Sequence, residues 1–315
     1  MKADSRAHAH SHAVSAADWG VLCLLSVTWG GSFFFYRVLA HSLPPFTVVL
    51  GRTAIAALAL NLWLLVRGDR LPGAPRLWLQ LAVIGLLNNA LPFCCFAFAE
   101  AHITSGLASI LNAATPVFSV LVGLVLRTGA PFTALRGLAI LFGLLGVAVL
   151  IGPSALHGGS GLVSELACLA ASISYAFGGF YSRRLSHLGP FKVAAGQSTA
   201  AALIMLPLAA AADRFWTLPM PSLPAWGALL GIGLMSTAFA YFLFFRLLER
   251  IDPTDLLLVT FLTPVSALLL GLAFLHEPVR PPAFAGMAMI GLSLVAIDGR
   301  IPARLAHAWR RAPVT

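Results

Sequence analysis

The chain has 315 residues, of which 59% are hydrophobic and only 10% are charged, and its mean hydropathy is +0.90. Because about a quarter of the residues of a soluble domain are charged, this composition excludes a water-soluble globule. The long apolar runs do not alternate in polarity as the strands of a membrane barrel do. The sequence therefore predicts an all-α polytopic membrane protein.

Ten apolar runs of membrane length follow one another along the chain. A helix needs about 20 apolar residues to cross the hydrocarbon core, and clusters of Pro and Gly mark the breaks between the runs. The predicted spans are residues 18–39, 46–66, 77–99, 103–126, 133–151, 161–182, 190–211, 225–246, 254–275 and 282–299. The connections that remain are short and leave no room for a sizeable soluble domain.

Polar tails flank the spans. Residues 1–17 are predicted to be a disordered cytoplasmic tail, and residues 300–315 a basic cytoplasmic tail. The first apolar run is too long for a signal-peptide core and ends without a small-residue cleavage site. We therefore expect the first span to be retained in the membrane.

The basic residues are sorted to one side of the predicted spans. Sixteen of the twenty Lys and Arg residues fall on the side of the N-terminus, three on the other side, and Arg52 alone lies within a span. By the positive-inside rule, both termini are cytoplasmic. The net charge of +9 therefore reflects topology and attraction to anionic lipid head groups, and we expect no nucleic-acid partner.

The two halves of the chain resemble each other. A shift of 148 residues places Thr115-Pro116-Val117 on Thr263-Pro264-Val265 without a gap, and a shift of 146 places residues 37–44 on 183–190. Residues 18–151 and 161–299 then form two repeats of five spans, and an odd number of spans inverts the second repeat. Inverted repeats are typical of transporters that hold substrate between the halves and open alternately to each side.

Short motifs stand at set places in five spans: Trp29-Gly30 in the first, Arg52 in the second, residues 108–116 in the fourth, Ser174-Tyr175-Ala176 in the sixth and Pro264 in the ninth. In their order and spacing, residues 18–299 resemble the EamA-type ten-helix bacterial exporters of the drug/metabolite transporter superfamily. The resemblance implies a carrier in the bacterial cytoplasmic (inner) membrane that exports small metabolites, amino acids among them. It also implies a central cavity lined by helices 1, 3, 4, 6, 8 and 9.

The chain departs from this family pattern at one position. Such chains often carry an acidic residue just after both the fourth and the ninth span. Here Glu277 follows the ninth span, whereas the fourth is followed by Arg127-Thr128-Gly129. We therefore do not expect an acid at this position to be essential in both halves.

Two prolines lie at equivalent mid-span positions, Pro116 in the fourth span and Pro264 in the ninth. Proline removes the hydrogen bond to the carbonyl four residues earlier, which frees the backbone oxygens of Asn112 and Thr260. These oxygens are candidate ligands for ammonium or hydroxyl groups, and paired kinks suit a moving helix. The alternative is a static kink healed by the Thr115 or Thr263 hydroxyl.

Asparagines lie near the middle of the third and fourth spans. Asn88 and Asn89 are adjacent, so they point about 100° apart on a helix, and at most one of them is expected to face the cavity. We favour Asn88, and we add the Asn112 side chain to the candidate site. Asparagines that cross-link helices, each contributing on the order of 1 kcal/mol, are an equally good interpretation.

Aromatic side chains from three spans complete the candidate site. Trp29 and Tyr175 are repeat equivalents, and Tyr241 lies in the eighth span. All three are well inside their spans, away from the interfacial belts where Trp and Tyr usually lie. They form a rim for an aromatic or aliphatic substrate, or they simply pack between helices.

Arg52 lies about seven residues, roughly 10 Å, into the second span from the outer face. At that depth its side chain reaches the outer head groups by snorkelling. The alternatives are a cation that orients a substrate carboxylate, or a partner for Glu100 near the outer end of the third span.

The sequence offers no proton relay, since Glu100, Glu165 and Asp255 lie at or near span ends and none of the nine histidines lies mid-span. We therefore expect facilitated diffusion, or coupling through a group that the sequence does not reveal.

We expect no cofactor and no bound metal. An enzyme is a poor alternative because His276-Glu277 lacks the second histidine of HExxH. A receptor or scaffold does not require an inverted repeat, and an importer or a lipid flippase remains within the transport class.

Overall fold

A computed structural model describes residues 15–128, 133–152, 159–251, 253–256, 258–279 and 281–298. Within this part the chain is helical and contains no strand. Residues 1–14 of the predicted N-terminal tail and the whole of the predicted C-terminal tail lie outside the described residues.

The described helices form ten segments. In chain order they are α1 (Ala16–Leu39), α2 (Pro45–Val66), α3 with η1 and α4 (Pro75–Gly85, Leu86–Ala90, Leu91–Ala99), α5 with α6 (Ser105–Asn112, Thr115–Val125), α7 (Ala134–Ile151), α9 with η2 (Ser160–Ser182, Arg183–Leu188), α10 with η3 (Pro190–Leu208, Ala209–Asp213), α11 with η5 and α12 (Leu223–Leu230, Gly231–Phe239, Ala240–Leu248), α13 with α14 (Pro253–Leu256, Leu258–Leu275), and α15 (Pro281–Asp298). Nine of these segments are long and apolar enough to cross a membrane, and residues Pro281–Ala296 form a shorter apolar helix. The ten-helix prediction is confirmed.

The predicted ends agree with the structure to within two residues, except in the sixth span, which continues as the 3-10 turn η2. Proline begins α2, α3 and α10, where its fixed φ suits the first helical turn and its missing N–H costs nothing. Thr104, Thr133 and Ser222 begin α5, α7 and α11 by accepting a hydrogen bond from a backbone N–H in the first turn. The connections therefore carry their own helix-start signals.

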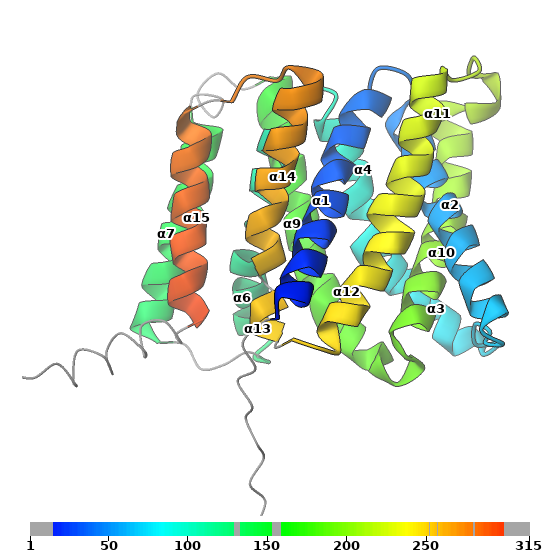
Figure 1. The fold of residues 1–315 in the computed structure, drawn as a ribbon, viewed down its shortest axis with the longest axis horizontal. Helices are drawn as coiled ribbons and strands as arrows, with labels where there is room; N and C mark the ends of the chain where they lie inside the picture. The colour runs from blue at the N-terminus through cyan, green and yellow to red at the C-terminus, as the bar shows by residue number, and fades with distance from the viewer. Residues whose placement is uncertain are drawn as a thin grey trace, which may run out of the picture.

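The packing follows the inverted repeat. The equivalent helices α2 and α10 pack on each other across the two halves, and so do α7 and α15. Helix α1 packs on α14, and its equivalent α9 packs on α6 in the corresponding way. The start of α1 and the end of α15 lie at the same edge of the bundle, and α7 and α15 stand together at its periphery (Figure 1).

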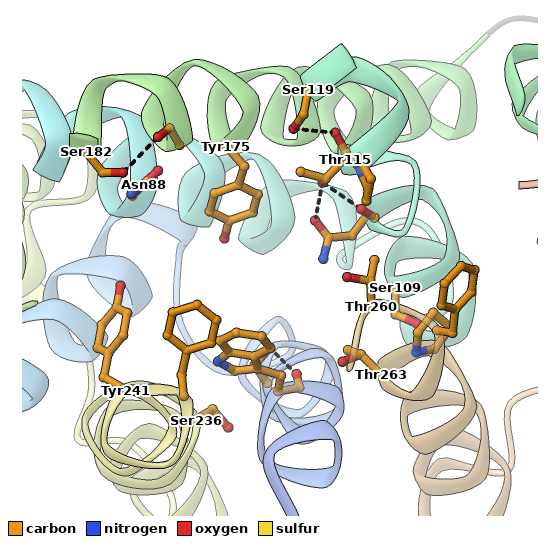
Figure 2. Close-up of a pocket in the computed structure, with 18 of the residues that line it drawn as sticks. Asn88, Ser109, Thr115, Ser119, Tyr175, Ser182, Ser236, Tyr241, Thr260 and Thr263 are labelled. Carbon is orange, nitrogen blue, oxygen red and sulfur yellow. Dashed lines mark hydrogen bonds between the residues drawn. The ribbon is translucent and has the colours of Figure 1, made fainter. Parts of the chain in front are cut away.

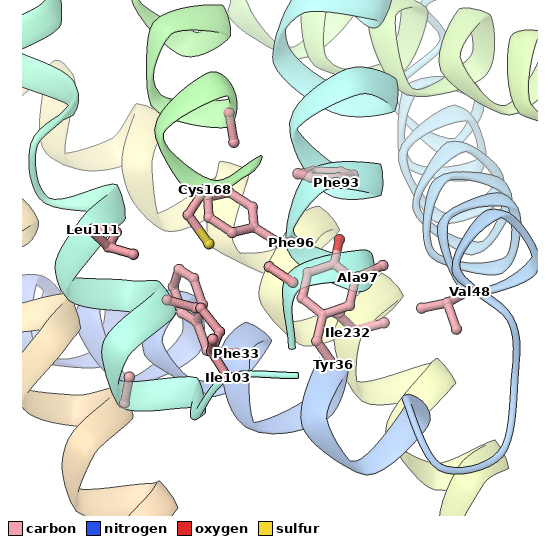
Figure 3. Packing of buried hydrophobic residues seen from close by; sticks show 14 of the residues in the cluster. Phe33, Tyr36, Val48, Phe93, Phe96, Ala97, Ile103, Leu111, Cys168 and Ile232 are labelled. Carbon is pink, nitrogen blue, oxygen red and sulfur yellow. The ribbon is translucent and has the colours of Figure 1, made fainter. Parts of the chain in front are cut away.

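A large hydrophobic core fills the opposite end of the bundle. Its buried members include Leu39 at the end of α1, Leu43 in the turn before α2, and Ile103 between α4 and α5. The rings of Phe33 and Phe96 meet edge to face, with centroids 5.3 Å apart, and these side chains lie close to Tyr36 and Ile103 in Figure 3. This end of the protein is therefore closed by packing.

Gly30 allows α1 and α14 to touch. A Cβ at this position would lie 2.7 Å from the Ser266 Cβ, 2.9 Å from the Thr263 carbonyl oxygen and 2.9 Å from the Ala267 nitrogen. Backbone atoms of α14 cannot make room without separating the helices. The Trp29-Gly30 motif is therefore explained in part by close packing of the first span on the ninth.

We predict that Gly30→Ala lowers the stability of the protein by about 1 to 3 kcal/mol, the usual cost of overpacking. The measurement is the thermal unfolding midpoint of the detergent-purified protein. Gly20→Ala in the same helix is the control, because a Cβ at Gly20 meets nothing within 4 Å. An equal midpoint for the two variants would contradict the close-packing explanation.

Candidate functional site

A cavity of about 990 Å³ lies between the two repeats, and residues of all ten spans line it. All nine residues of the candidate site line this cavity: Trp29, Arg52, Asn88, Asn112, Pro116, Tyr175, Tyr241, Thr260 and Pro264. Figure 2 shows Tyr175 and Tyr241 approaching from different helices, with Asn88 at one end of the cavity wall. Residues that are far apart in the sequence therefore share one space.

The cavity extends to the edge of the bundle where the described chain begins and ends. Its lining includes Arg136 at the start of α7, Ser182 at the end of α9 and Asp255 at the start of the ninth span. Because successive spans reverse direction, these three positions lie at the same edge as the start of α1. In the other direction the lining ends at residues such as Arg52 and Phe96.

An ion pair joins α1 in the first half to the segment after α14 in the second half, at the closed end. Arg37 Nε lies 3.3 Å from Glu277 Oε1, and Arg37 Nη1 donates to the Glu100 carbonyl oxygen at 2.7 Å. Glu277 Oε2 accepts from the backbone N–H and the hydroxyl of Ser105, at 3.0 and 2.7 Å. We call Arg37, Glu100, Ser105 and Glu277 the closing cluster; it ties α1 and α5 to the segment after α14.

Arg52 does not reach the outer head groups, so the snorkelling interpretation is wrong. Its side chain is only 5% exposed. It donates from Nε to the Thr237 hydroxyl at 2.9 Å and from Nη1 to the Tyr36 hydroxyl at 2.8 Å, and its guanidinium lies 3.5 Å from the Phe93 ring centroid. Partners from other helices hold the side chain inward, and none of these three partners is Glu100.

The structure distinguishes the two adjacent asparagines of the third span. Asn88 lines the cavity, whereas Asn89 is fully buried and is absent from the lining. The Asn88 side chain lies directly over Gly178, where a Cβ would overlap the Asn88 amide. Asn88 therefore combines the two roles that the sequence left open, helix contact and cavity wall.

Two π-helical segments border the cavity, and sequence reasoning missed them both. Segment η1 contains Asn88, and η5 contains Ser236 and Thr237. The shift of 148 residues that relates the repeats carries η1 into η5. Pro92, just after η1, could have indicated the first of these segments, because proline removes the hydrogen bond to the carbonyl of Asn88. Such π segments are frequent at functional sites.

The two prolines have different backbone surroundings in the structure. The fourth span is interrupted between Asn112 and Thr115, whereas α14 continues as a helix through Pro264. The Thr115 hydroxyl donates to the Asn112 carbonyl oxygen at 2.7 Å, so the oxygen freed by Pro116 is already occupied. The Thr263 hydroxyl donates instead to Val259, not to Thr260.

Aromatic rings occur in pairs along the cavity. Trp29 lies 5.6 Å from Phe244, and Tyr241 stacks on Phe245 at 5.8 Å between centroids. Tyr175 stacks on Phe96 at 6.3 Å. The second ring of each pair was not among the predicted site residues, although all of them line the cavity.

Polar residues outside the predicted set also line the cavity. Gln197 occupies the position equivalent to Arg52 and donates to the Tyr241 hydroxyl at 2.6 Å. The hydroxyl-bearing members are Ser32, Ser109, Thr115, Ser119, Ser182, Ser236, Thr237 and Thr263. None of them was predicted to line the site, because Ser and Thr commonly bond to their own helix in membranes.

We predict that a cysteine placed at Ser119, on the cavity wall, reacts with a membrane-impermeant maleimide only from the side on which an N-terminal tag is accessible. Native cysteines are first replaced by alanine. The measurement compares labelling of intact spheroplasts with that of inverted vesicles. Ser198→Cys is the control and should stay unlabelled, because Ser198 is fully buried. Labelling of Ser119→Cys from the opposite side alone would contradict the described opening.

An all-helical bundle in which two inverted repeats enclose a large cavity is the architecture of a membrane transporter. The profile of the EamA-like transporter family matches the chain twice, over residues 19–152 and 162–297. The chain therefore belongs to the EamA-like transporter family.

Similar proteins cover nearly the whole chain. The uncharacterized inner membrane transporter YedA of Escherichia coli (strain K12) is 27% identical over 281 residues, which cover 89% of this chain and 90% of YedA. Protein PecM of Dickeya dadantii is 27% identical over 277 residues, covering 86% and 88%. A solved crystal structure has the same fold, with a TM-score of 0.61, 19% identity and coverage of 90% of this chain and 98% of the other.

Proposed function

We propose that the protein exports small metabolites, amino acids among them, across the bacterial inner membrane by alternating access. The observation that supports this most directly is the cavity of about 990 Å³, which extends to one edge of the bundle and is closed at the other. Its volume lies at the upper end of the range for small-molecule sites, roughly 300 to 1,000 Å³. YedA, an inner membrane transporter, supports the location.

The described conformation is that of a carrier ready to load on the side of its termini. The sorting of basic residues gives both termini a cytoplasmic location, so the open edge faces the cytoplasm in this proposal. Substrate then enters among Trp29, Asn112 and Tyr175, and export requires the closing cluster to separate. The two repeats move relative to each other about the site between them.

The π-helical segments provide places where helices bend. Their hydrogen-bond pattern departs from that of an α-helix, and kinks in helices concentrate at such segments. Because η1 and η5 occupy equivalent positions in the third and eighth spans and both border the cavity, each half has one bending point at the site. The interruption at residues 113–114 adds a further one in the first half.

We predict that Glu277→Gln favours opening of the closed end. The substitution removes the charge that holds Arg37 and weakens the contact with Ser105. Loss of charged hydrogen bonds costs about 1.5 to 3 kcal/mol each, so the balance between the two conformations should shift about 10- to 100-fold. The measurement is labelling of Ser109→Cys in the cavity wall from the periplasmic side.

Glu249→Gln is the matched control, since Glu249 is an exposed acid at the other edge of the bundle and should leave the labelling unchanged. Unchanged labelling in Glu277→Gln as well would show that the closing cluster does not hold this end shut.

We predict that Trp29→Ala and Asn112→Ala each reduce export at least several-fold while the protein still inserts and folds. Trp29→Ala removes a cavity ring, and Asn112→Ala removes the side-chain amide next to the interrupted helix. The measurement is a metabolite profile of the medium from overproducing cells, with purified yield and thermal midpoint as the folding check. Trp216→Ala, on an exposed side chain away from the cavity lining, is the control. Wild-type export by both cavity variants would make the site assignment wrong.

A further inference from the structure

The guanidinium of Arg52 is the charged group deepest in the cavity. It is held among neutral partners, the hydroxyls of Tyr36 and Thr237 and the face of the Phe93 ring. Thr237 itself donates to the carbonyl of Ile232 five residues earlier, at 2.8 Å, as the π-helical geometry of η5 allows. These contacts fix the position of the cation, and none of them comes from a carboxylate.

A buried guanidinium differs from other buried ionisable groups because it stays protonated under all physiological conditions. A carboxyl or an amine in the same place would become neutral, whereas Arg52 has to be solvated or paired with an anion. Two of its nitrogens are engaged by the hydroxyls of Tyr36 and Thr237. A guanidinium has five N–H donors, so donors remain for a ligand oxygen.

No acid of the described chain forms an ion pair with Arg52. Glu100, at the end of α4, is fully buried, and neither of its carboxylate oxygens has a hydrogen-bond partner in the described structure. Burial and the neighbouring carboxylate of Glu277 raise the pKa of the Glu100 carboxyl well above its usual range, against the opposing effect of Arg37 and Arg52. Asp255 is the one acid among the described lining residues, and it lies at the mouth of the cavity together with Arg136. The inner part of the lining therefore carries only the positive charge of Arg52.

The walls of the cavity that Arg52 lines suit the body of an organic molecule. Phe96, Tyr175 and Trp29 supply apolar and aromatic surface, and Asn112 and Ser109 supply neutral hydrogen-bonding groups. A cationic ligand would find no counter-ion in this inner part and would be repelled by Arg52. A carboxylate, by contrast, matches the guanidinium in charge and in bidentate geometry.

We propose that Arg52 binds the carboxylate of the transported substrate, which makes the protein a carrier of organic acids with an apolar body that discriminates against cations. This inference rests on the proposed transport function and specifies its substrate class. It also accounts for export without a proton relay. An inside-negative potential of 100 mV favours the outward distribution of a monovalent anion by about 50-fold.

The first test measures binding of matched probes to the purified full-length protein in lipid nanodiscs. Butyrate, isocaproate and hydrocinnamate are each compared with the primary amide and the primary amine of the same carbon skeleton, by titration calorimetry. We expect at least one acid to bind about 10- to 100-fold more tightly than its amide, the range for charged hydrogen bonds, and the amines to bind more weakly still. Chloride should compete only weakly.

Variants assign the preference to this residue. Arg52→Gln should reduce the ratio of acid to amide affinity to about one, and Arg52→Lys should keep part of the ratio. Arg136→Gln removes another cation of the same cavity at its mouth and should keep the wild-type ratio. The inference is overturned if no acid binds, if amides or amines bind as well as acids, or if Arg52→Gln retains the preference.

The second test separates this inference from the transport function on which it rests. Proteoliposomes are loaded with the acid, amide and amine probes and with leucine, and efflux is followed with and without a valinomycin-imposed inside-negative potential. Acid efflux should accelerate under the potential and carry a current, and amide efflux should not respond. Flux of leucine or amides without any preference for acids would overturn the carboxylate site and leave the carrier function standing. An absence of flux for every probe would count against the proposed function itself.

Discussion

Hydrocarbon offers no partners to polar groups, and this constraint organises the whole molecule. Many hydroxyls inside the spans bond to their own helix, as Thr53 does to Val49 and Ser26 to Leu22. Others join helices, such as Ser174, which donates to the Leu87 carbonyl at 2.7 Å. Polar side chains also gather along the cavity between the halves, where water or a ligand can reach them.

The inverted repeat explains how such a cavity arises. Equivalent helices pack on one another across the halves, as α2 does on α10, and their remaining faces surround a central space. Gly30 brings α1 against α14 at one side of that space, and η1 and η5 border it at equivalent places. At the closed end the symmetry is lost, since Glu277 has no acidic counterpart in the first half. An approximate symmetry therefore builds the cavity, and local departures from it differentiate the two ends.

Hydropathy and proline positions were sufficient to predict the ten spans and their order, because a bilayer imposes length and apolarity directly on the sequence. The predicted site residues share one cavity because polar residues in the middle of a span are disfavoured against lipid and tend to face the interior of the bundle. The side-chain environment of Arg52 was not predictable, since its partner Thr237 lies 185 residues further along the chain. The π segments and the difference between Pro116 and Pro264 depend on backbone hydrogen bonds, which no composition pattern records.

The interrupted fourth span has a thermodynamic consequence. If the two repeats were interchangeable, exchanging their conformations would convert one end state of the carrier into the other, and the two states would have equal free energy. The break between Asn112 and Thr115 has no counterpart in α14, and the ion pair of Arg37 with Glu277 belongs to one end alone. In the proposed alternating-access cycle the two end states are therefore unequal in free energy, and the empty carrier has a resting side. In that cycle the empty protein returns to its resting side over one barrier, and the loaded protein leaves that side over another. The two reorientation steps therefore have different rates.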